Sequence, residues 1–346
     1  MICFTTFDLM NFSRDISLKK LNTFGIDVKT KYFISFSSVK RLLEIVSSDI
    51  YKQNKTFVLG GGSNLLFTQD YNGLIIHNKI TGIDILEDSI DSTTIEVGAG
   101  EDWHDFVIWS INRDLSGIEN LSLIPGLVGG TPIQNIGAYG AEVKDVIHSV
   151  KYLSIEDCKM KIIHNKDCQF AYRDSIFKHD LKEKVIITSV IYKLSKKPLN
   201  KIKYGTIKDE LTFLDQKPSP KSISDAIINI RSRKLPNPEK LGNSGSFFKN
   251  PIIKTIQFKK LKDKFPGIIG YELPDQKTKI AAGWLIDNAG LKGYRIADAG
   301  VHKDQALVIV NHGKSTGKEI IKLAQHIQKV ILEKYKIKIE PEVNIL

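Results

Sequence analysis

Three polar residues in short, loop-like segments have side chains that could do chemistry: Arg173 in YRDSIFK, Ser246 in GNSGSFFKNP and Glu342 in EPEV. A guanidinium group can hold a carboxylate with two parallel N–H donors and keeps its charge, although a surface salt bridge with Asp174 would use the same groups. A serine hydroxyl is a poor acid, which donates a proton only when a strong carbanion lies against it and neighbouring groups polarise the O–H bond. From its local sequence alone, Glu342 would be interpreted as an ordinary solvent-exposed side chain.

The elements that must position these residues include three glycine-rich segments at strand ends. GGGSN (60–64) follows the apolar stretch TFVL, GAG (98–100) ends another strand-like stretch, and residues 120–142 carry five glycines and two prolines with almost no periodicity. GGGSN lacks the GxGxxG spacing of dinucleotide-binding folds, and the LLFTQDYNGLII that follows indicates another strand instead of a helix. Small residues let backbone N–H groups approach phosphate, so the three loops could jointly surround a long, phosphate-bearing cofactor.

Length and composition indicate a soluble globular chain. The 346 residues, 42% of them hydrophobic and 26% charged, suffice for roughly two or three compact units. No apolar run approaches the length of a membrane span, and MICFTTFDLMNFSRD lacks the features of a secretory signal, so a cytoplasmic location without membrane association is expected. The net charge of +11 comes from lysines scattered through the chain, so no nucleic-acid partner is expected. Cys3, Cys158 and Cys168 form no CxxC pair, and neither a disulfide framework nor a metal site is predicted.

Periodicity predicts a strand-rich first half and a mixed second half. One clear helix is expected over Glu101–Asn112, and apolar strands are expected at VIHSVKYLSIE, KMKIIH and VIITSVIYKL. Further helices are expected at 221–234, 255–264, 280–289 and 316–335, with a strand at ALVIVN. GKSTGKE (313–319) resembles a P-loop, but its glycines are too close together and Glu319 replaces the magnesium-binding Ser or Thr. Thr316 and Glu319 instead predict a helix capping box.

Seven motifs occur in the order that is typical of the UDP-N-acetylenolpyruvoylglucosamine reductase family, which the chain resembles from about Leu21 to nearly its last residue. The motifs are NTFGID (22–27), LGGGSNLLF (59–67), IPGLVGGTPIQNIGAYGAE (124–142), YRDSIFK (172–178), GNSGSFFKNP (242–251), KIAAGWLIDNAG (279–290) and EPEV (340–343). The stretch IIGYELPDQKTK is similar to the tyrosine-bearing segment that caps the substrate in the longer type of this family.

The resemblance implies an α+β protein with a vanillyl-alcohol-oxidase-like (PCMH-type) FAD-binding fold in two subdomains and a C-terminal α+β substrate-binding domain. The expected boundaries are 15–200 for the FAD-binding domain, with its subdomains split near 70, 201–220 for a connector, 221–335 for the substrate-binding domain and 336–346 for a C-terminal segment that returns to the active site. The polar, proline-containing sequence between 195 and 221 supports a boundary there.

The resemblance also implies a reaction. In that family NADPH reduces FAD, and the flavin reduces the enolpyruvyl ether of UDP-N-acetylenolpyruvoylglucosamine to UDP-N-acetylmuramate for peptidoglycan synthesis, and hence for cell-wall biogenesis, cell shape and division. Hydride from flavin N5 adds to the terminal alkene carbon, negative charge moves toward the carboxylate, and the α-carbon takes a proton. The catalytic residues implied are Arg173 to stabilise the enolate, Ser246 to donate the proton and Glu342 to orient or polarise near the carboxylate.

Binding residues are carried over from the same motifs. FAD is expected to contact Gly60, Gly61, Gly62, Ser63 and Asn64 at its pyrophosphate, with Gly126, Ile133, Gln134, Asn135, Gly137 and Ala138 along the rest. Substrate contacts are expected at Tyr172, Tyr204, Lys234, Asn250, Tyr271 and Gln305, although a structural amide would equally explain Gln305. Lys249 and Asn250 would polarise the serine hydroxyl or hold an anion, while Phe247 and Phe248 would exclude water. The partners implied are the UDP-sugar and NADPH, and a monomer is expected.

Two alternatives remain open at this point. Another flavoenzyme of the same fold could oxidise a small substrate with O₂; such enzymes often attach the flavin through His or Cys, and neither occurs in the glycine loops. A flavin- or nucleotide-binding module without chemistry is the other, although the three catalytic residue types are all present. The family pattern continues EPEV with arginine, whereas this chain has Asn344, which leaves the geometry of Glu342 open. His104 and His302 are expected to be structural.

Overall fold

The structure, a computed structural model, describes residues 11–203 and 205–346, so Tyr204, a predicted substrate contact, lies outside the described residues. The chain forms two compact units that alternate along the sequence. Of the described residues, the first comprises 11–17, Lys29–Gly61 and Asp70–Ile230, and the second comprises Leu18–Val28, Gly62–Gln69 and Arg231–Leu346. The division therefore passes through the GGGSN loop, with Gly60 and Gly61 in the first unit and Gly62 to Asn64 in the second.

The first sheet of the first unit has four strands in the order β1-β2-β5-β3. They are β1 (Ser13–Ser17), β2 (Lys29–Phe36), β3 (Thr56–Leu59) and β5 (Tyr71–Asn78). The three strands β2, β5 and β3 are parallel, and helices α1 (Val39–Ser47) and α2 (Asp49–Gln53) make the crossover from β2 to β3. The crossover helix α1 buries Leu42 and Ile45 with Phe36 and Ile76 of the sheet. The apolar strand predicted before GGGSN is β3, which pairs with β5.

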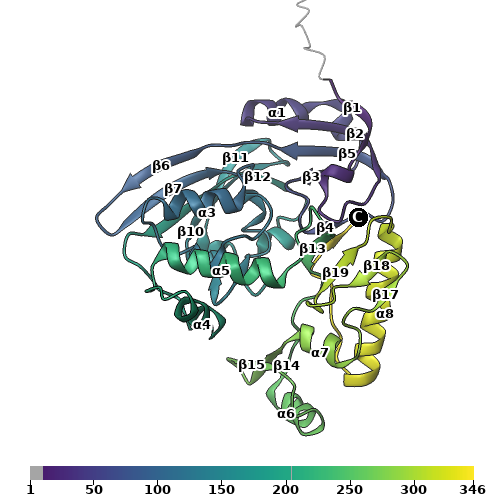
Figure 1. The fold of residues 1–346 in the computed structure, drawn as a ribbon. Coiled ribbons are helices and arrows are strands. Elements are labelled where there is room, and N and C mark those ends of the chain that lie inside the picture. Colours follow the sequence, from purple (N-terminus) through teal and green to yellow (C-terminus); the bar gives the residue numbers. More distant parts are fainter. Residues whose placement is uncertain (1–10, 204) are drawn as a thin grey trace, which may run out of the picture. The chain divides into compact units, whose positions relative to one another are not determined.

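The second sheet of the first unit is antiparallel, with five strands in the order β11-β10-β12-β7-β6 (Figure 1). They are β6 (Ile83–Asp88), β7 (Ser92–Gly98), β10 (Ile147–Ser154), β11 (Lys159–His164) and β12 (Val185–Ser195). Helix α3 (Trp103–Ile111) begins at Asp102, whose carboxylate accepts from the N–H groups of His104 and Asp105. Trp103 and Phe106 pack with Tyr192 of β12 in the core, so this predicted helix and the predicted strands are confirmed.

Residues 201–220, expected to be a polar connector, contain helix α4 (Gly205–Phe213) and the first residue of α5 (Pro220–Lys234). Ile207 and Leu211, four residues apart on one face of α4, are buried with Ile223 and Ile227 of α5. Two apolar residues one helical turn apart thus give this mostly polar stretch a buried face, which packs against α5. The helix predicted at 221–234 is confirmed as α5.

The main sheet of the second unit has the order β13-β19-β18-β17. Its strands are β13 (Gly242–Ser246), β17 (Arg295–Ile296), β18 (Ala299–Val301) and β19 (Val308–Asn311). Helices α7 (Ala282–Asn288) and α8 (Gly317–Tyr335) belong to the same unit, and α8 contacts β18 and β19. Thr316 and Glu319 form a capping box at the start of α8, so GKSTGKE begins a structural helix, as predicted.

Two smaller sheets complete the second unit. The order β14-β16-β15 joins β14 (Ile252–Lys254), β15 (Gly270–Leu273) and β16 (Lys277–Ile280), with helix α6 (Thr255–Lys264) following β14. The other sheet pairs β4 (Leu65–Leu66) with β20 (Asn344–Ile345) in parallel. The NTFGID segment also lies in this unit, where Phe24 packs edge-on against Phe247 and its carbonyl accepts from the Asn311 side chain at 2.9 Å.

Candidate active site

The three glycine-rich segments that were predicted to act jointly contact one another in the first unit. Of the GGGSN loop, only Gly60 and Gly61 belong to that unit. A Cβ on Gly61 would lie 3.0 Å from Gly126 Cα, and one on Gly129 would lie 2.8 Å from Ala99 Cβ. The Gly129 N–H donates to the Ala99 carbonyl at 2.9 Å. The backbones therefore touch where side chains would not fit, and small residues of this kind let backbone N–H groups approach a phosphate. Such groups suit the pyrophosphate of FAD, so the residues present fit that cofactor.

His77 supports the glycine loop from the neighbouring strand. It lies opposite Leu59 in the parallel pairing of β3 with β5, and its imidazole is hydrogen-bonded to the Gly60 backbone. Burial, together with the nearby charge of Lys79, lowers the pKa of His77 to about 4, against which the Gly60 contact acts. The ring is thus neutral at physiological pH and adds no charge behind the loop. The sequence interpretation missed this residue, because its only signal was an isolated histidine in an apolar strand.

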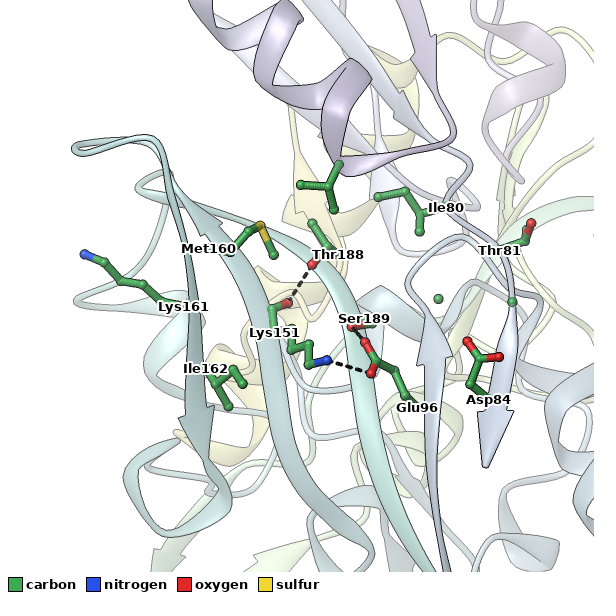
Figure 2. Close-up of a pocket in the computed structure, with 13 residues that line it drawn as sticks. Ile80, Thr81, Asp84, Glu96, Lys151, Met160, Lys161, Ile162, Thr188 and Ser189 are labelled. Atoms are coloured by element: carbon green, nitrogen blue, oxygen red, sulfur yellow. Dashed lines mark hydrogen bonds and ion pairs between the residues drawn. The ribbon is translucent and has the colours of Figure 1, made fainter. Parts of the chain in front are cut away.

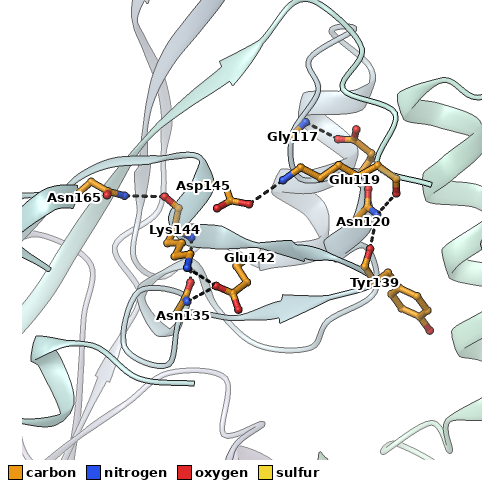
Figure 3. A network of polar contacts seen from close by, with 10 residues as sticks. Gly117, Glu119, Asn120, Asn135, Tyr139, Glu142, Lys144, Asp145 and Asn165 are labelled. Carbon is orange, nitrogen blue, oxygen red and sulfur yellow. Dashed lines mark hydrogen bonds and ion pairs between the residues drawn. The ribbon is translucent and has the colours of Figure 1, made fainter. Parts of the chain in front are cut away.

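Asn135, predicted to line the FAD site, uses its side chain inside its own loop (Figure 3). Its Oδ1 accepts from the Lys144 N–H at 3.1 Å, and its Nδ2 donates to Glu142 Oε2 at 3.0 Å and to the Ala171 carbonyl at 2.9 Å. The residue is fully buried and has a left-handed backbone with φ of 42°. Asn135 therefore holds together the two ends of the hairpin formed by β8 (Gly137–Ala138) and β9 (Ala141–Glu142), and its contact with a cofactor stays a prediction.

A second buried asparagine fixes the other end of the same loop. Asn120 donates from Nδ2 to the Tyr139 carbonyl at 2.9 Å and to the Lys201 carbonyl at 2.8 Å, as Figure 3 shows for the Tyr139 contact. Close by, Glu119 is buried and accepts from the Ser116 hydroxyl at 2.7 Å and from the Gly117 N–H. The segment 120–142, which lacks periodicity in the sequence, is held in one shape by these polar contacts.

Arg173 contacts this loop directly. Its Nη2 donates to the Gly137 carbonyl at 2.6 Å, and its backbone has a left-handed φ of 56°. The Arg173 carbonyl accepts from Lys178 Nζ at 2.8 Å, and the Ser175 hydroxyl donates to the Ile133 carbonyl at 2.6 Å. Asp174, the alternative partner in the sequence, forms an ion pair with His179 at 2.8 Å. The Arg173 guanidinium, which was predicted to hold the substrate carboxylate, is therefore hydrogen-bonded to the loop that was predicted to bind FAD. Both lie in the first unit.

Ser246 is the last residue of β13, at a place where the pairing of this strand with β19 is irregular. The pairing of β13 with β19 shifts register between Asn243 and Ser246, and Gly245 adopts a φ of 69° there. The Asn243 Oδ1 accepts from the Gly245 N–H at 2.9 Å, which fixes the turn. Bulges of this kind re-aim side chains near active sites, and the Ser246 side chain is exposed whereas Ser244 is buried. Glycine at 245 is thus required by the backbone, and it places the hydroxyl at the surface.

Phe247 and Phe248, whose exclusion of water from the reaction stays a prediction, are buried next to Ser246. They are 0% and 1% exposed, and their rings meet at 5.1 Å in an edge-to-face arrangement. Both are core residues that anchor the chain beside Ser246. Next to them, the Lys249 N–H donates to the Glu340 carbonyl at 2.9 Å and the Glu342 N–H donates to the Phe247 carbonyl at 2.8 Å. The EPEV motif therefore lies alongside GNSGSFFKNP, which brings the backbones of Glu342 and Ser246 into neighbouring positions.

The residues predicted to bind substrate are spread over both units. In the first unit, Tyr172 lies beneath the Arg173 guanidinium, whose Cζ is 5.5 Å from the ring centre. In the second unit, Asn250 Oδ1 accepts from the Ala282 N–H at the start of α7, so this oxygen caps a helix and leaves the amide NH₂ as the group for a ligand. The others there are Lys234, exposed in the last turn of α5, Tyr271, 42% exposed on β15, and Gln305, whose N–H donates to His302 Nδ1.

A hollow of about 490 Å³ lies in the first unit, and none of these residues lines it (Figure 2). It is lined by residues of the five-stranded sheet and by the segment 80–82. Two of its charged groups pair with each other, since Lys151 Nζ lies 2.6 Å from Glu96 Oε2, and the Ser189 hydroxyl donates to Glu96 at 2.7 Å. The hollow contains none of the predicted catalytic or binding residues, so it is not the candidate active site.

The histidines expected to be structural have structural contacts. His104 Nδ1 accepts from the Leu123 N–H at 3.1 Å, and His302 Nδ1 accepts from the N–H groups of Asp304 and Gln305. Within the described part of the chain, no group of three or more His, Cys, Asp or Glu side chains is arranged to hold a metal ion. No helix among those residues combines the length and apolarity needed to cross a membrane.

Gly62 provides a test of the glycine loop. A Cβ there would lie 2.0 Å from the Leu21 carbonyl oxygen, and its φ is 64°, whereas a Cβ on Gly60 would lie 3.7 Å from Leu127. Gly62→Ala is expected to lower the free energy of unfolding by about 2–5 kcal/mol, from backbone strain and overlap. Gly60→Ala should change it little. Urea unfolding of the two FAD-free variants measures this difference, and equal stabilities would show that Leu21 does not crowd the loop.

Comparison with known families agrees with the motif order. Residues 237–346 match the family described as UDP-N-acetylenolpyruvoylglucosamine reductase, C-terminal domain, and residues 30–161 match the FAD binding domain. A relative from Flavobacterium johnsoniae, named UDP-N-acetylenolpyruvoylglucosamine reductase, is 49% identical over 97% of this chain and 100% of its own length. One of the same name from Chromobacterium violaceum is 42% identical over 97% of this chain and 99% of its own length.

A solved structure shows the same fold. The UDP-N-acetylenolpyruvylglucosamine reductase (MurB) from Thermus caldophilus aligns with a TM-score of 0.69 at 24% identity, covering 97% of this chain and 98% of its own. Together with the FAD-binding match over residues 30–161, this likeness confirms the predicted α+β flavoprotein fold with a C-terminal domain of its own.

Proposed function

This chain belongs to the UDP-N-acetylenolpyruvoylglucosamine reductase family, and we propose that it reduces the enolpyruvyl ether of UDP-N-acetylenolpyruvoylglucosamine to UDP-N-acetylmuramate, a step of peptidoglycan precursor synthesis. FAD is the bound cofactor and NADPH the source of electrons. The overall change adds one hydride and one proton across a carbon–carbon double bond, so the enolpyruvyl ether becomes a lactyl ether and NADPH becomes NADP⁺.

One observation carries the proposal: Arg173 donates to the carbonyl of Gly137, in the part of the chain that matches an FAD binding domain. A permanent positive charge that is hydrogen-bonded to a loop suited to the flavin can stabilise the negative charge that the reaction builds beside the cofactor. The substrate has a carboxylate on the carbon that becomes negative, and a guanidinium can hold both carboxylate oxygens.

The glycine segments and their neighbours are the proposed FAD site. Backbone N–H groups at Gly60 to Asn64 would hold the pyrophosphate, with residues of the loop from Gly126 to Ala138 along the remainder of the cofactor. When bound, FAD takes two electrons from NADPH and supplies them to the substrate as a hydride equivalent.

Ser246 is the proposed proton donor to the α-carbon of the substrate. A serine hydroxyl can serve in this step because the carbon it protonates is a far stronger base than water. The register shift at Gly245 exposes the hydroxyl, and the buried Phe247 limits how far its backbone can move. Glu342, whose backbone is bonded to Phe247, would orient the reacting carboxylate or polarise a group near it. The remaining expected substrate residues, Tyr172, Tyr204, Lys234, Asn250, Tyr271 and Gln305, are proposed to hold the nucleotide-sugar.

The test is a two-step reaction in the absence of oxygen. The purified protein should show flavin absorbance bands, and NADPH should bleach them. UDP-N-acetylenolpyruvoylglucosamine should then restore the oxidised spectrum rapidly. UDP-N-acetylglucosamine is the matched control, because it has the same nucleotide and sugar but no enolpyruvyl group, and it should leave the flavin reduced. If oxygen restores the spectrum and the enolpyruvyl substrate does not, the protein is an oxidase of the same fold and the reductase proposal is wrong.

A further inference from the structure

The segment from Glu340 to Leu346 connects two parts of the proposed site within the second unit. At its beginning it runs beside the Ser246 motif, where the Lys249 N–H donates to the Glu340 carbonyl and the Glu342 N–H donates to the Phe247 carbonyl. At its end it forms β20, which pairs in parallel with β4 directly after the GGGSN loop. Glu342 therefore lies between the part of the segment that contacts the Ser246 motif and the part that pairs with β4.

Two asparagines join the glycine loop to this segment; we refer to Asn64 and Asn344 as the asparagine clasp. The Asn64 carbonyl accepts from the Asn344 backbone N–H at 3.2 Å and from Asn344 Nδ2 at 2.9 Å. In return, Asn64 Nδ2 donates to the Glu342 carbonyl at 3.4 Å. The residues are 280 positions apart in the sequence, yet each side chain bonds to the backbone of the other segment. The carbonyl and the N–H of Glu342 are thus each held by one of the two neighbouring motifs.

The side-chain hydrogen bonds of the clasp are additional to the contacts that hold β20 on the unit. Leu65 and Leu66 are buried in β4, and Val343 is buried just before β20. Beyond the clasp, the Leu346 oxygen accepts from the backbone and the hydroxyl of Thr68 at 2.7 and 2.8 Å. The Asn344 side chain, in contrast, is exposed and contributes a polar contact without burying apolar surface. Its removal should therefore affect the geometry of Asn64 and Glu342 more than the stability of the fold.

We propose that the asparagine clasp couples FAD binding to the placement of Glu342, with Asn344 as a positioning residue. The inference rests on the proposed function, in which the glycine loop up to Asn64 holds the FAD pyrophosphate and Glu342 acts on the substrate. A cofactor that orders Asn64 also orders the peptide of Glu342, through the Asn64 side chain. Because such coupling is reciprocal, loosening the segment at Asn344 weakens FAD binding. Where the family pattern has arginine, the short amide of Asn344 reaches the Asn64 carbonyl in this chain.

Amide hydrogen exchange on the whole protein, with FAD removed and restored, tests the coupling without any turnover. In the wild type, FAD should slow exchange at the amides of Glu342, Asn344 and Leu346. Asn344→Asp is isosteric but places a carboxylate oxygen where the amide donor was, facing the Asn64 carbonyl. This variant should lose most of the FAD-dependent protection. Asn344→Gln keeps the donor and should restore it, and Ile345→Ala, a neighbouring exposed side chain with no part in the clasp, should behave as wild type.

Affinity and half-reactions provide the second readout. Flavin fluorescence titration of the FAD-free protein should give a dissociation constant about fivefold to tenfold weaker for Asn344→Asp, since one hydrogen bond is lost and a repulsive contact is gained. Reduction of the bound flavin by NADPH should stay within about twofold of wild type, while oxidation by the enolpyruvyl substrate should slow about tenfold. A purely structural role would lower the unfolding temperature and slow both half-reactions together.

The outcomes separate this inference from the proposed function. FAD-dependent protection that is lost in Asn344→Asp but kept in Ile345→Ala supports the clasp, whether or not the UDP-sugar oxidises the flavin. Equal protection in all four proteins, or a wild type whose 342–346 amides ignore FAD, overturns the clasp while leaving the reductase proposal intact. A wild type that binds no FAD overturns both.

Discussion

Replacing Ser246 with alanine is expected to slow oxidation of the reduced flavin by the enolpyruvyl substrate by about two to four orders of magnitude, the usual contribution of a positioned general acid. Reduction of the flavin by NADPH should remain nearly normal, because that half-reaction needs no proton on a substrate carbon. Stopped-flow absorbance of the flavin measures the two half-reactions separately. The exposed hydroxyl at the register shift of β13 is the group removed.

Ser244→Ala is the matched control for this variant. Ser244 lies two residues earlier on the same strand, is 8% exposed, and its hydroxyl has no hydrogen-bond partner among the described residues. Removing it should change the rate of either half-reaction by no more than about threefold, because no described hydrogen bond is lost. If Ser246→Ala slowed both half-reactions equally, a folding defect would explain the result. If it slowed neither, another group would be the proton donor.

Arg173→Lys is expected to lower kcat/KM for the enolpyruvyl substrate by about 10²–10³-fold, the scale of losing one preorganised donor to a developing oxyanion. Lysine keeps the charge but cannot present two parallel donors to a carboxylate. Its shorter, single donor group also cannot hold the carboxylate and the Gly137 carbonyl as the guanidinium can. Steady-state kinetics with varied UDP-sugar measures the effect, and FAD binding should weaken far less than turnover.

Arg113→Lys provides the comparison for a cation outside the site. Arg113 stacks on Trp109 with its Cζ 3.9 Å from the ring centre, and its side chain is exposed. The same chemical change at this position should leave kcat/KM within about twofold, since a surface cation contributes little. Full activity in Arg173→Lys would show that charge alone suffices, and the two-donor role of Arg173 would be abandoned.

The local elements were predictable from particular residues. Periodicity over Glu101–Asn112 predicted α3, and in the structure the Asp102 carboxylate caps the start of that helix. Thr316 and Glu319 predicted a capping box, and both of its hydrogen bonds are present. These signals work because a helix start depends on residues within one turn of each other.

Other features depended on contacts that no short window contains. For Asn135, which stays a predicted cofactor residue, only the structure shows that its side chain bonds to Glu142, Lys144 and Ala171. The burial of both rings of the double phenylalanine in GNSGSFFKNP is likewise visible only in the structure, while their role as a water barrier stays a prediction. A buried polar or aromatic side chain and a ligand-contacting one can have the same sequence signature, because burial is a property of the packed chain.

By itself, the sequence determined the family, the order of the motifs, the nature of the groups at Arg173, Ser246 and Glu342, and the positions of most helices and strands. The tertiary structure alone decided that Arg173 contacts Gly137, that a positive φ at Gly245 exposes Ser246, and that Asn344 meets Asn64 across 280 positions. Residue types and local spacing set chemistry and secondary structure, since these depend on near neighbours. The partners of each donor and acceptor depend on which distant segments pack together, because every buried polar backbone group must find a partner somewhere in the folded chain.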